Sequence, residues 1–429
     1  MVSWAEQFAD HWIIADTNNH EESIKNVLAY HSKNPIDGII TFWEDDVLLA
    51  SKLRDRLNLI GIPYSIANKA RNKYNFRSFC SQNNIPAPNY LLISSPQDIQ
   101  KAHNLTFPVV IKPTYGANSS FVVKVNTKEE LNSVYDFIKK TISTSVESAL
   151  HEGSDLMIEE YIDGDEVDID ILLQHGKIKF WSITDDYQTE EPFFLDNGQA
   201  IPSDLPEKSQ NELIEMAETV LEKLGITDAC IHFEAKYTTK GPVPLEVNLR
   251  LGGGVYSFVK HVWHVNMVEN AVKIACGIYM EKVKKPELPY QHLAIGVLAP
   301  KKSGVVTSLS IPEDFKKKYK AKDLYIYKEV GDGIFTPPSG YEYLGWLSIP
   351  GDNSIDAREN LERATAAIQY EIAPFSSESA LGKTERKNGK SPAVMNKNLL
   401  QSIGKQKNLI KLLNKKQKTC CELGHSSAN

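Results

Sequence analysis

The chain has 429 residues, of which 41% are hydrophobic, and it contains 24 glycines and 21 prolines. This composition excludes a fibrous or largely disordered protein and predicts two or three folded domains. The formal net charge is −7, and because no apolar run reaches the roughly 18 residues of a membrane span, we expect a soluble, cytoplasmic protein without a membrane partner.

The cysteines favour the same compartment. They are odd in number and scattered, three of them in segments patterned as core: Cys80, Cys230, Cys276, Cys420 and Cys421. This arrangement predicts reduced thiols and offers no zinc-ligand spacing. The first residues, "MVSWAEQFADHW", also lack the basic start and the apolar stretch of a signal peptide.

The last part of the chain, residues 376–429, differs from the rest. Lys383 to Lys418 carries eleven basic residues and one acid, Glu385. The remainder is therefore acidic, which gives no reason to expect nucleic-acid binding by the main body. The basic segment is predicted to be a disordered extension, and binding to nucleic acid or an acidic membrane is a minority interpretation.

Residues 1–72 alternate short apolar runs with helical patterns. Strands are expected over residues 11–17 and 37–43, and helices over residues 21–33 and 45–59. Strands separated by helices at this spacing predict a parallel sheet with crossover helices.

The next segment begins with a helical pattern over residues 72–84. Two apolar strands follow within residues 107–125, joined by a loop that contains glycine and serine, and a charged helix is expected over residues 127–142. In residues 156–173 the pair Asp163-Gly164 predicts a turn between two strands. After that turn, Val167, Ile169 and Ile171 should share one strand face, and Glu166, Asp168 and Asp170 the other.

A helix over residues 211–225 should end at Gly225, and a hairpin should follow in residues 228–251. A further helix is expected over residues 259–277, then strands and a last amphipathic helix to residue 372. No internal repeat is visible.

The hairpin ends in "PLEVNLRLGGG". Because side chains on a strand alternate between its two faces, one face should carry Glu246, Asn248 and Arg250. The other face should carry Leu245, Val247, Leu249 and Leu251. If the loop is residues 239–241, Glu234 lies opposite Glu246, a like-charged pair that is destabilising unless a cation bridges it. The ligands Glu234, Glu246 and Asn248 all offer oxygen, which suits Mg²⁺. A slip of one residue would move Glu234 to the apolar face.

Lys112 ends an apolar strand beside the loop of Gly116, Ser119 and Ser120. An ammonium next to backbone amides and hydroxyls suits triphosphate oxygens, but for this residue taken alone an ordinary exposed lysine at a strand end is the favoured interpretation. The absence of a G-x-x-x-x-G-K-[ST] run excludes the P-loop mechanism. The stretch "EEYIDGDE", from Glu159 to Glu166, suits the edge of a nucleotide pocket, and a solvated acidic hairpin is the alternative.

The order of these motifs resembles the ATP-grasp superfamily over about residues 10 to 375: Lys73, Lys112, the loop of residues 116–120, "EEYIDGDE", "HFEAKY" and "EVNLRLGGG". The phrases "NLRLGGG" and "DGIITFWEDDVLLASKL" are most similar to carboxylate-amine ligases of the L-amino acid ligase and carnosine synthase type. The resemblance implies ATP and Mg²⁺ as cofactors, usually two ions, with Mn²⁺ as a substitute. It also implies an acyl phosphate route to an amide from a carboxylate and an amine, both from amino acids, in an enzyme that is often a homodimer.

The resemblance also assigns roles residue by residue. It implies phosphate contacts for Lys73 and Lys112 and a closing loop that contains Ser119 and Ser120. Glu159 resembles the carboxylate on the adenine side, Glu160 and Ile162 the backbone that meets the base, and Glu166 the ribose ligand. The metal ligands are matched by Glu234, Glu246 and Asn248. Arg250 matches the arginine that steadies the acyl phosphate, and Arg250 and Lys112 are the catalytic candidates. Arg250 gripping a substrate carboxylate is the alternative.

The expected fold is therefore an α/β (α+β) ATP-grasp fold. Its parts are a short Rossmann-like N-terminal domain (1–72), a lid subdomain (73–165), a C-terminal subdomain with the metal site (166–375) and the basic tail (376–429). The family's first domain usually opens with a glycine-containing strand-helix-strand unit, and this chain is expected to begin inside it. A carboxylase-type enzyme and a catalytically silent ATP-binding protein are the competing functions.

Aromatic residues and histidines near the motifs offer candidates for the substrate pocket, with core packing equally favoured: Tyr115, Trp181, Tyr256, His261, Trp263 and His264. The two histidines are three apart on an expected helix, a spacing that can bind metal, but no third soft ligand accompanies them.

Overall fold

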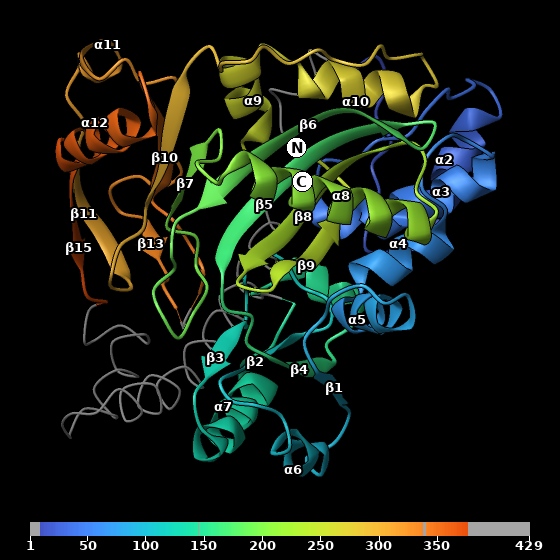
Figure 1. The fold of residues 1–429 in the computed structure, drawn as a ribbon, viewed down its shortest axis with the longest axis horizontal. Coiled ribbons are helices and arrows are strands. Elements are labelled where there is room, and N and C mark those ends of the chain that lie inside the picture. The colour runs from blue at the N-terminus through green and yellow to red at the C-terminus, as the bar shows by residue number, and fades with distance from the viewer. Residues whose placement is uncertain (1–8, 145, 338–339, 376–429) are drawn as a thin grey trace, which may run out of the picture.

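The computed structural model describes residues 9–144, 146–337 and 340–375 (Figure 1). Its strands form sheets of four, eight and three strands, and within the described residues these strands pair antiparallel. The expected mixed α/β class is confirmed. Among the residues described, no helix has the length and apolar character needed to cross a membrane.

The four-stranded sheet, in the order β1-β4-β2-β3, is the lid sheet. Its strands are β1 (Tyr90–Ile93), β2 (Val109–Pro113), β3 (Val123–Val125) and β4 (Leu156–Glu160), and it carries α6 (Asp98–Ala102), α7 (Lys128–Thr141) and the short 3₁₀ helix η2 (Ser148–Glu152). Helix α7 begins where the Thr127 side chain accepts a hydrogen bond from the Glu130 amide. It buries Leu131, Val134 and Ile138 against the sheet, so the lid has its own core.

The eight-stranded sheet, in the order β12-β14-β10-β7-β6-β5-β8-β9, forms the body of the molecule. Its strands are β5 (Asp165–Gln174), β6 (Lys177–Asp186), β7 (Gly198–Ile201), β8 (Ala229–Thr238), β9 (Gly241–Asn248), β10 (His292–Leu298), β12 (Asp323–Ile326) and β14 (Gly345–Gly351). As predicted, Val167, Ile169 and Ile171 point into a core. Helices α4 (Tyr64–Arg71), α5 (Lys73–Gln82) and α8 (Glu207–Leu224) contribute to that core, and Figure 1 shows α8 crossing β5, β8 and β9. Gly225 ends α8 with a left-handed φ of 79°.

The remaining elements lie at the far edge of this sheet. Strands β11 (Gly304–Ser310), β13 (Gly333–Ile334) and β15 (Gln369–Ala373) form the three-stranded sheet, with α11 (Phe315–Lys318) nearby. Helix α12 (Ser354–Ala366) packs through Ala357, Leu361 and Ala364 into the core that includes Leu347 of β14.

The parallel sheet expected in the first 72 residues is wrong for the part that the structure describes. Helices α2 (His20–His31) and α3 (Val47–Leu57) and the 3₁₀ turn η1 (Glu44–Asp46) form, but residues 11–17 and 37–43 contain no strand. A strand needs a hydrogen-bonding neighbour, and here the Ile39 carbonyl accepts from the Arg54 guanidinium at 2.9 and 3.2 Å instead. Ile14 stays 74% exposed.

One local prediction is corrected. The single helix expected over residues 259–277 is two, α9 (Val255–Trp263) and α10 (Met267–Ala275), because His264 turns left-handed and the Asn266 side chain caps a new helix. The Asp163-Gly164 pair lies between two strands as predicted, and these strands, β4 and β5, belong to different sheets.

The domain limits given above stay a prediction. Within them, α5 packs Phe76, Phe79 and Cys80 into the core of the large sheet, so the residues unique to the lid core begin near β1. The basic tail, with Cys420 and Cys421, lies outside the described residues, whereas Cys80, Cys230 and Cys276 are free thiols.

Candidate active site

A cavity of about 910 Å³ lies between the lid sheet and the large sheet. Its lining comes from β2 and β4 of the lid, from residues 116–120, which we call the lid loop, and from β5, β6, β8 and β9 of the large sheet. Its volume lies in the range of sites that enclose a cofactor-sized molecule. Eleven of the twelve predicted site residues line it: Lys73, Lys112, Ser119, Ser120, Glu159, Ile162, Glu166, Glu234, Glu246, Asn248 and Arg250.

The like-charged pair of the hairpin forms as expected, by a different route. Strands β8 and β9 are joined by a two-residue turn, which on its own would put Glu234 opposite Leu245. A bulge between Glu234 and Ala235 in the pairing absorbs one residue of β9, so Glu234 faces Glu246. Leu245, predicted on the core face, lines the cavity instead.

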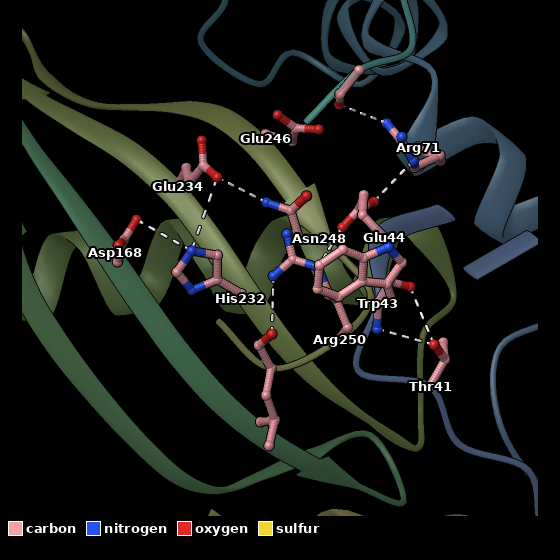
Figure 2. A network of polar contacts seen from close by, with 12 residues as sticks. Thr41, Trp43, Glu44, Arg71, Asp168, His232, Glu234, Glu246, Asn248 and Arg250 are labelled. Carbon is pink, nitrogen blue, oxygen red and sulfur yellow. Dashed lines mark hydrogen bonds and ion pairs between the residues drawn. The ribbon is translucent and has the colours of Figure 1, made fainter. Parts of the chain in front are cut away.

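Asn248 completes this group of oxygen ligands. Its Nδ2 donates to Glu234 Oε1 at 2.9 Å (Figure 2). Burial and then the charge of Glu246 raise the pKa of Glu234 to about 7. The charges of His232 and Lys73 lower this pKa but do not outweigh burial and the charge of Glu246, so the donor set fits a hard divalent cation.

Lys73 is the cation nearest to Glu246. Its Nζ lies 2.9 Å from Glu246 Oε1 and also donates to the Gly116 carbonyl at 3.1 Å. Burial alone would raise the pKa of Glu246, but the charges of Lys73 and Arg71 outweigh it and the pKa is lowered. Lys73 at the start of α5 therefore connects Glu246 of β9 with the lid loop.

Lys112 is buried at the end of β2 and pairs with Glu159 of β4. Burial, the largest effect, lowers the pKa of this lysine. Glu159 also accepts from Arg77 Nε at 2.7 Å, so this carboxylate holds two cations. Arg77 comes from α5, and no motif distinguishes it in the sequence.

The lid loop has an unusual backbone. Gly116 has φ +151°, and Asn118 and Ser119 adopt left-handed φ values of 51° and 52°. Ser120 is 3% exposed, and its side chain hydrogen-bonds Glu147. The two predicted serines therefore line the cavity in different settings, with Ser120 held by a carboxylate.

Glu160 is the predicted residue that does not line the cavity. Its carboxylate accepts from Asn89 Nδ2 at 2.9 Å and from the Thr106 amide at 2.8 Å, and its own amide donates to the Asn89 carbonyl at 3.0 Å. Ile162 and Glu166 do line it, and Glu166 pairs with Lys236 at 3.2 Å.

The aromatic and histidine candidates lie elsewhere. None of the six suggested from the sequence belongs to the described lining of this cavity. Lys285 stacks on Trp181 and Trp263 with its Nζ 3.4 and 4.5 Å from the ring centroids. His264 is the left-handed residue that ends α9, so it does not share a helix with His261, and its ring stacks on Tyr290 at 3.7 Å between ring centroids.

The structure adds a group that sequence reasoning missed. His232 of β8 donates or accepts at Nδ1 with Asp170 at 2.9 Å, and its Nε2 lies 3.5 Å from Asp168 and 3.9 Å from Glu234. Ligand atoms of Asp168, His232 and Glu234 lie within 4.8 Å of one another. The alternation of polar residues on β5 and β8 was the signal that could have found them.

A second acidic patch continues from this group. Gln199 Nε2 donates to Asp168 and Asp186 at 2.7 Å each. Burial, then the charge of Glu234, raises the pKa of Asp168, and burial, then the charge of Asp168, raises the pKa of Asp186. This end of the cavity is therefore suited to a positively charged group.

Comparisons with known proteins agree with this geometry. Residues 105–258 match the family model described as ATP-grasp domain, and residues 296–373 match L-amino acid ligase C-terminal domain 2. The crystal structure of L-amino acid ligase from Bacillus licheniformis superimposes with a TM-score of 0.71 and 21% identity, covering 83% of this chain and 85% of that one. Two segments of the chain thus match an ATP-grasp domain model and an L-amino acid ligase domain model, and the fold is that of the L-amino acid ligase structure.

Two curated relatives match most of this chain, but they differ in how much of their own length is matched. Carnosine synthase 1 of Homo sapiens is 23% identical over 313 residues, which is 69% of this chain but 37% of that protein. The L-arginine-specific L-amino acid ligase of Bacillus subtilis is 24% identical over 340 residues, 76% of this chain and 78% of the relative. The chain thus spans little more than a third of the length of the human carnosine synthase it matches.

Proposed function

We propose that this ATP-grasp protein is a carboxylate-amine ligase that joins two amino acids, or an amino acid and another amine, and converts ATP to ADP and phosphate. The observation that carries the proposal is the pair Glu234 and Glu246, which faces the cavity beside Asn248. Such a pair is stable next to a divalent cation, and ATP-grasp enzymes in general use ATP and Mg²⁺.

The chemistry has two steps. In the first, a carboxylate oxygen attacks the γ-phosphorus of ATP, the bond from that phosphorus to the β,γ-bridging oxygen breaks, and ADP leaves. In the second, an amine nitrogen attacks the acyl carbon, the carbon–oxygen bond to the phosphoryl group breaks, and phosphate leaves as the nitrogen loses a proton. Bound Mg²⁺ neutralises the phosphate charge.

The side chains of the chain supply position and charge. In the proposal, Mg²⁺ is held by Glu234, Glu246 and Asn248. Two ions bind there, and Mn²⁺ can replace Mg²⁺. The phosphates are contacted by Lys73 and Lys112. Arg250 steadies the acyl phosphate. Lys73 is now paired with Glu246, so a cation on Glu246 would free its ammonium for a phosphate oxygen.

The nucleotide is proposed to lie along the lid side of the cavity. Ile162 and Leu245 are apolar lining residues that suit the base, and Glu166 is placed to accept the ribose hydroxyls. The lid side of the cavity is bounded by Glu159, which pairs with Arg77 and Lys112, and by Ser119 and Ser120 of the lid loop. Water exclusion by the loop would protect the acyl phosphate from hydrolysis.

The carboxylate and the amine are proposed to be those of amino acids, because the relatives named above are a carnosine synthase and an L-amino acid ligase. We also propose a cytoplasmic setting, supported by the buried free thiols Cys80 and Cys230. A homodimer is the proposed assembly, which light scattering would test.

The test is phosphate release from Mg-ATP across single amino acids and all their pairs, with the nucleotide product identified. ADP and phosphate that appear only with particular pairs would support the ligase and name its substrates. Release with bicarbonate alone would support a carboxylase-type enzyme. ATP binding without release under any condition would refute the ligase in favour of a silent binding protein.

A further inference from the structure

One carboxylate outside the predicted site lies between two arginines. Glu44, in the turn η1, is 6% exposed. Its Oε1 lies 2.9 Å from Nε of Arg71 and its Oε2 lies 2.6 Å from Nε of Arg250 (Figure 2). Within this ion triplet Arg71 is 2% exposed, so the pair that it forms with Glu44 is shielded from water, whereas the Arg250 side chain is 16% exposed. No water can readily replace a lost partner there, and the geometry of the triplet is therefore held firmly.

Both arginines connect Glu44 with groups that line the cavity. Arg250 lines the cavity, and its Nη1 donates to the Leu251 carbonyl at 2.9 Å. Arg71 Nη1 donates to the carbonyl of Gly116, at the start of the lid loop, at 3.1 Å. Glu44 does not belong to the described lining. It therefore acts on the cavity through other side chains.

The contacts of Arg250 fix its direction. A guanidinium is planar and rigid, so anchoring two of its nitrogens sets where the third points. The Glu44 carboxylate forms an ion pair at Nε, without hydrogen-bond geometry, and the Leu251 carbonyl accepts from Nη1. Among the contacts of the described residues, Nη2 is the donor left for a phosphoryl oxygen. Without Glu44, one carbonyl would hold the end of a long flexible side chain.

We infer that Glu44 is the positioning residue that aims Arg250 at the reacting phosphoryl group and, through Arg71, holds the lid loop beside it. This inference rests on the proposed ligase function. It gives the N-terminal segment a part in catalysis, because Glu44 lies in the turn that leads into α3. A purely structural ion triplet would stabilise the fold and leave the phosphoryl chemistry alone.

The experiment compares Glu44→Gln and Glu44→Asp with the wild type, using the activating pair found by phosphate release. Misplacement of a charge by about 1 Å can lower a rate about 100-fold, so we expect kcat to fall about 100-fold in Glu44→Gln, with KM for ATP within about twofold. Glu44→Asp keeps the charge and should recover part of the rate. Asp46→Asn removes the same charge from the same turn, outside the triplet, and should act as the wild type.

A double variant separates positioning from structure. If Glu44 works through Arg250, adding Glu44→Gln to Arg250→Ala causes no further loss of kcat, because the group to be positioned is gone. Losses that multiply, or a Glu44→Gln enzyme with wild-type kcat, would overturn the inference. Circular dichroism and thermal melting check the fold, and Glu44→Asp serves if Glu44→Gln unfolds.

A second readout does not depend on turnover. Hydrogen exchange at the Arg250 Nε–H, followed by arginine-selective NMR, should be slow in the wild type and fast in Glu44→Gln. Slow exchange that persists in Glu44→Gln refutes the positioning role, whatever the turnover. The two hypotheses can also fail separately. If the wild type shows no turnover but Glu44→Gln still abolishes the slow exchange, the ligase function is refuted, whereas the contact between Glu44 and Arg250 is supported.

Discussion

The buried triplet of Arg77, Glu159 and Lys112 ties the lid to the body of the protein. Glu159 belongs to β4 of the lid sheet, and Arg77 to α5, which packs under the large sheet. Their side chains are 4% and 1% exposed. Replacing the carboxylate by an amide of the same shape, Glu159→Gln, would leave two buried cations without a counter-charge.

The size of the effect follows from the pKa of Glu159. Burial on its own would raise this pKa, but the charges of Arg77 and Lys112 lower it from 4.5 to about 2. One pKa unit corresponds to about 1.4 kcal/mol, so the carboxylate contributes about 3 kcal/mol to the free energy of unfolding at neutral pH. Breaking a buried ion pair from one side typically costs about 3 to 5 kcal/mol, which agrees.

The sign of the pH dependence follows as well. The folded-state pKa is depressed, so this stabilisation is complete above about pH 4.5 and is lost as the pH falls towards 2. The difference in unfolding free energy between wild type and Glu159→Gln should therefore shrink from about 3 kcal/mol at pH 7 to about 1 kcal/mol at pH 3.

Urea unfolding followed by far-ultraviolet circular dichroism, without nucleotide, measures this difference. Glu160→Gln is the matched control, because Glu160 is the next residue but, among the described residues, its carboxylate accepts hydrogen bonds from the neutral donors Asn89 and Thr106. We expect the control to lose about 1 kcal/mol. A loss in Glu159→Gln no greater than in the control, or one independent of pH, would refute the reasoning.

Four further predictions concern the site and the core. Glu246→Ala should keep its circular dichroism spectrum and lose at least about 100-fold in ATP turnover; retained turnover would remove it from the metal ligands. Truncation after Phe375 should spare turnover, because the described lining ends before residue 256, and an inactive truncated chain would give the tail a part in the enzyme. Burial raises the pKa of Cys80 to about 11, so iodoacetamide at pH 8 should leave it unlabelled in the native protein, as mass spectrometry would show. Gly252→Ala should lower the melting temperature, because a Cβ there would lie 2.5 Å from the His232 ring; an unchanged melting temperature would contradict this.

The glycines after the hairpin illustrate what the sequence alone could not explain. In the sequence, the run "GGG" stands out only as the end of the motif "EVNLRLGGG", which resembles a nucleotide-dependent ligase site. In the structure, Gly252 lies against the His232 ring, and Gly254 takes a φ of 77° at the start of α9. Packing and backbone conformation therefore account for two of the three glycines.

Local pattern determined most of the body of the protein. The alternation on β5, the alternation on β9 from Glu246 onward, the capped helix α7 and the Gly225 terminus depend on neighbours in the chain, and the structure has all of them. The pairing of Glu234 with Glu246 was also predicted, although the two-residue turn and the bulge that produce it were not. The roles of the site residues stay predictions until turnover is measured.

Tertiary structure decided what depends on partners far along the chain. Glu44 meets Arg250 across 206 positions, as their numbers show, and Arg77 meets Glu159 across 82; no periodicity marks such pairs, because folding alone brings them together. The apolar runs at residues 11–17 and 37–43 read as strands, yet a strand forms only where another strand offers its edge. A sequence specifies which residues favour a strand, and the assembled fold decides whether the edge is there.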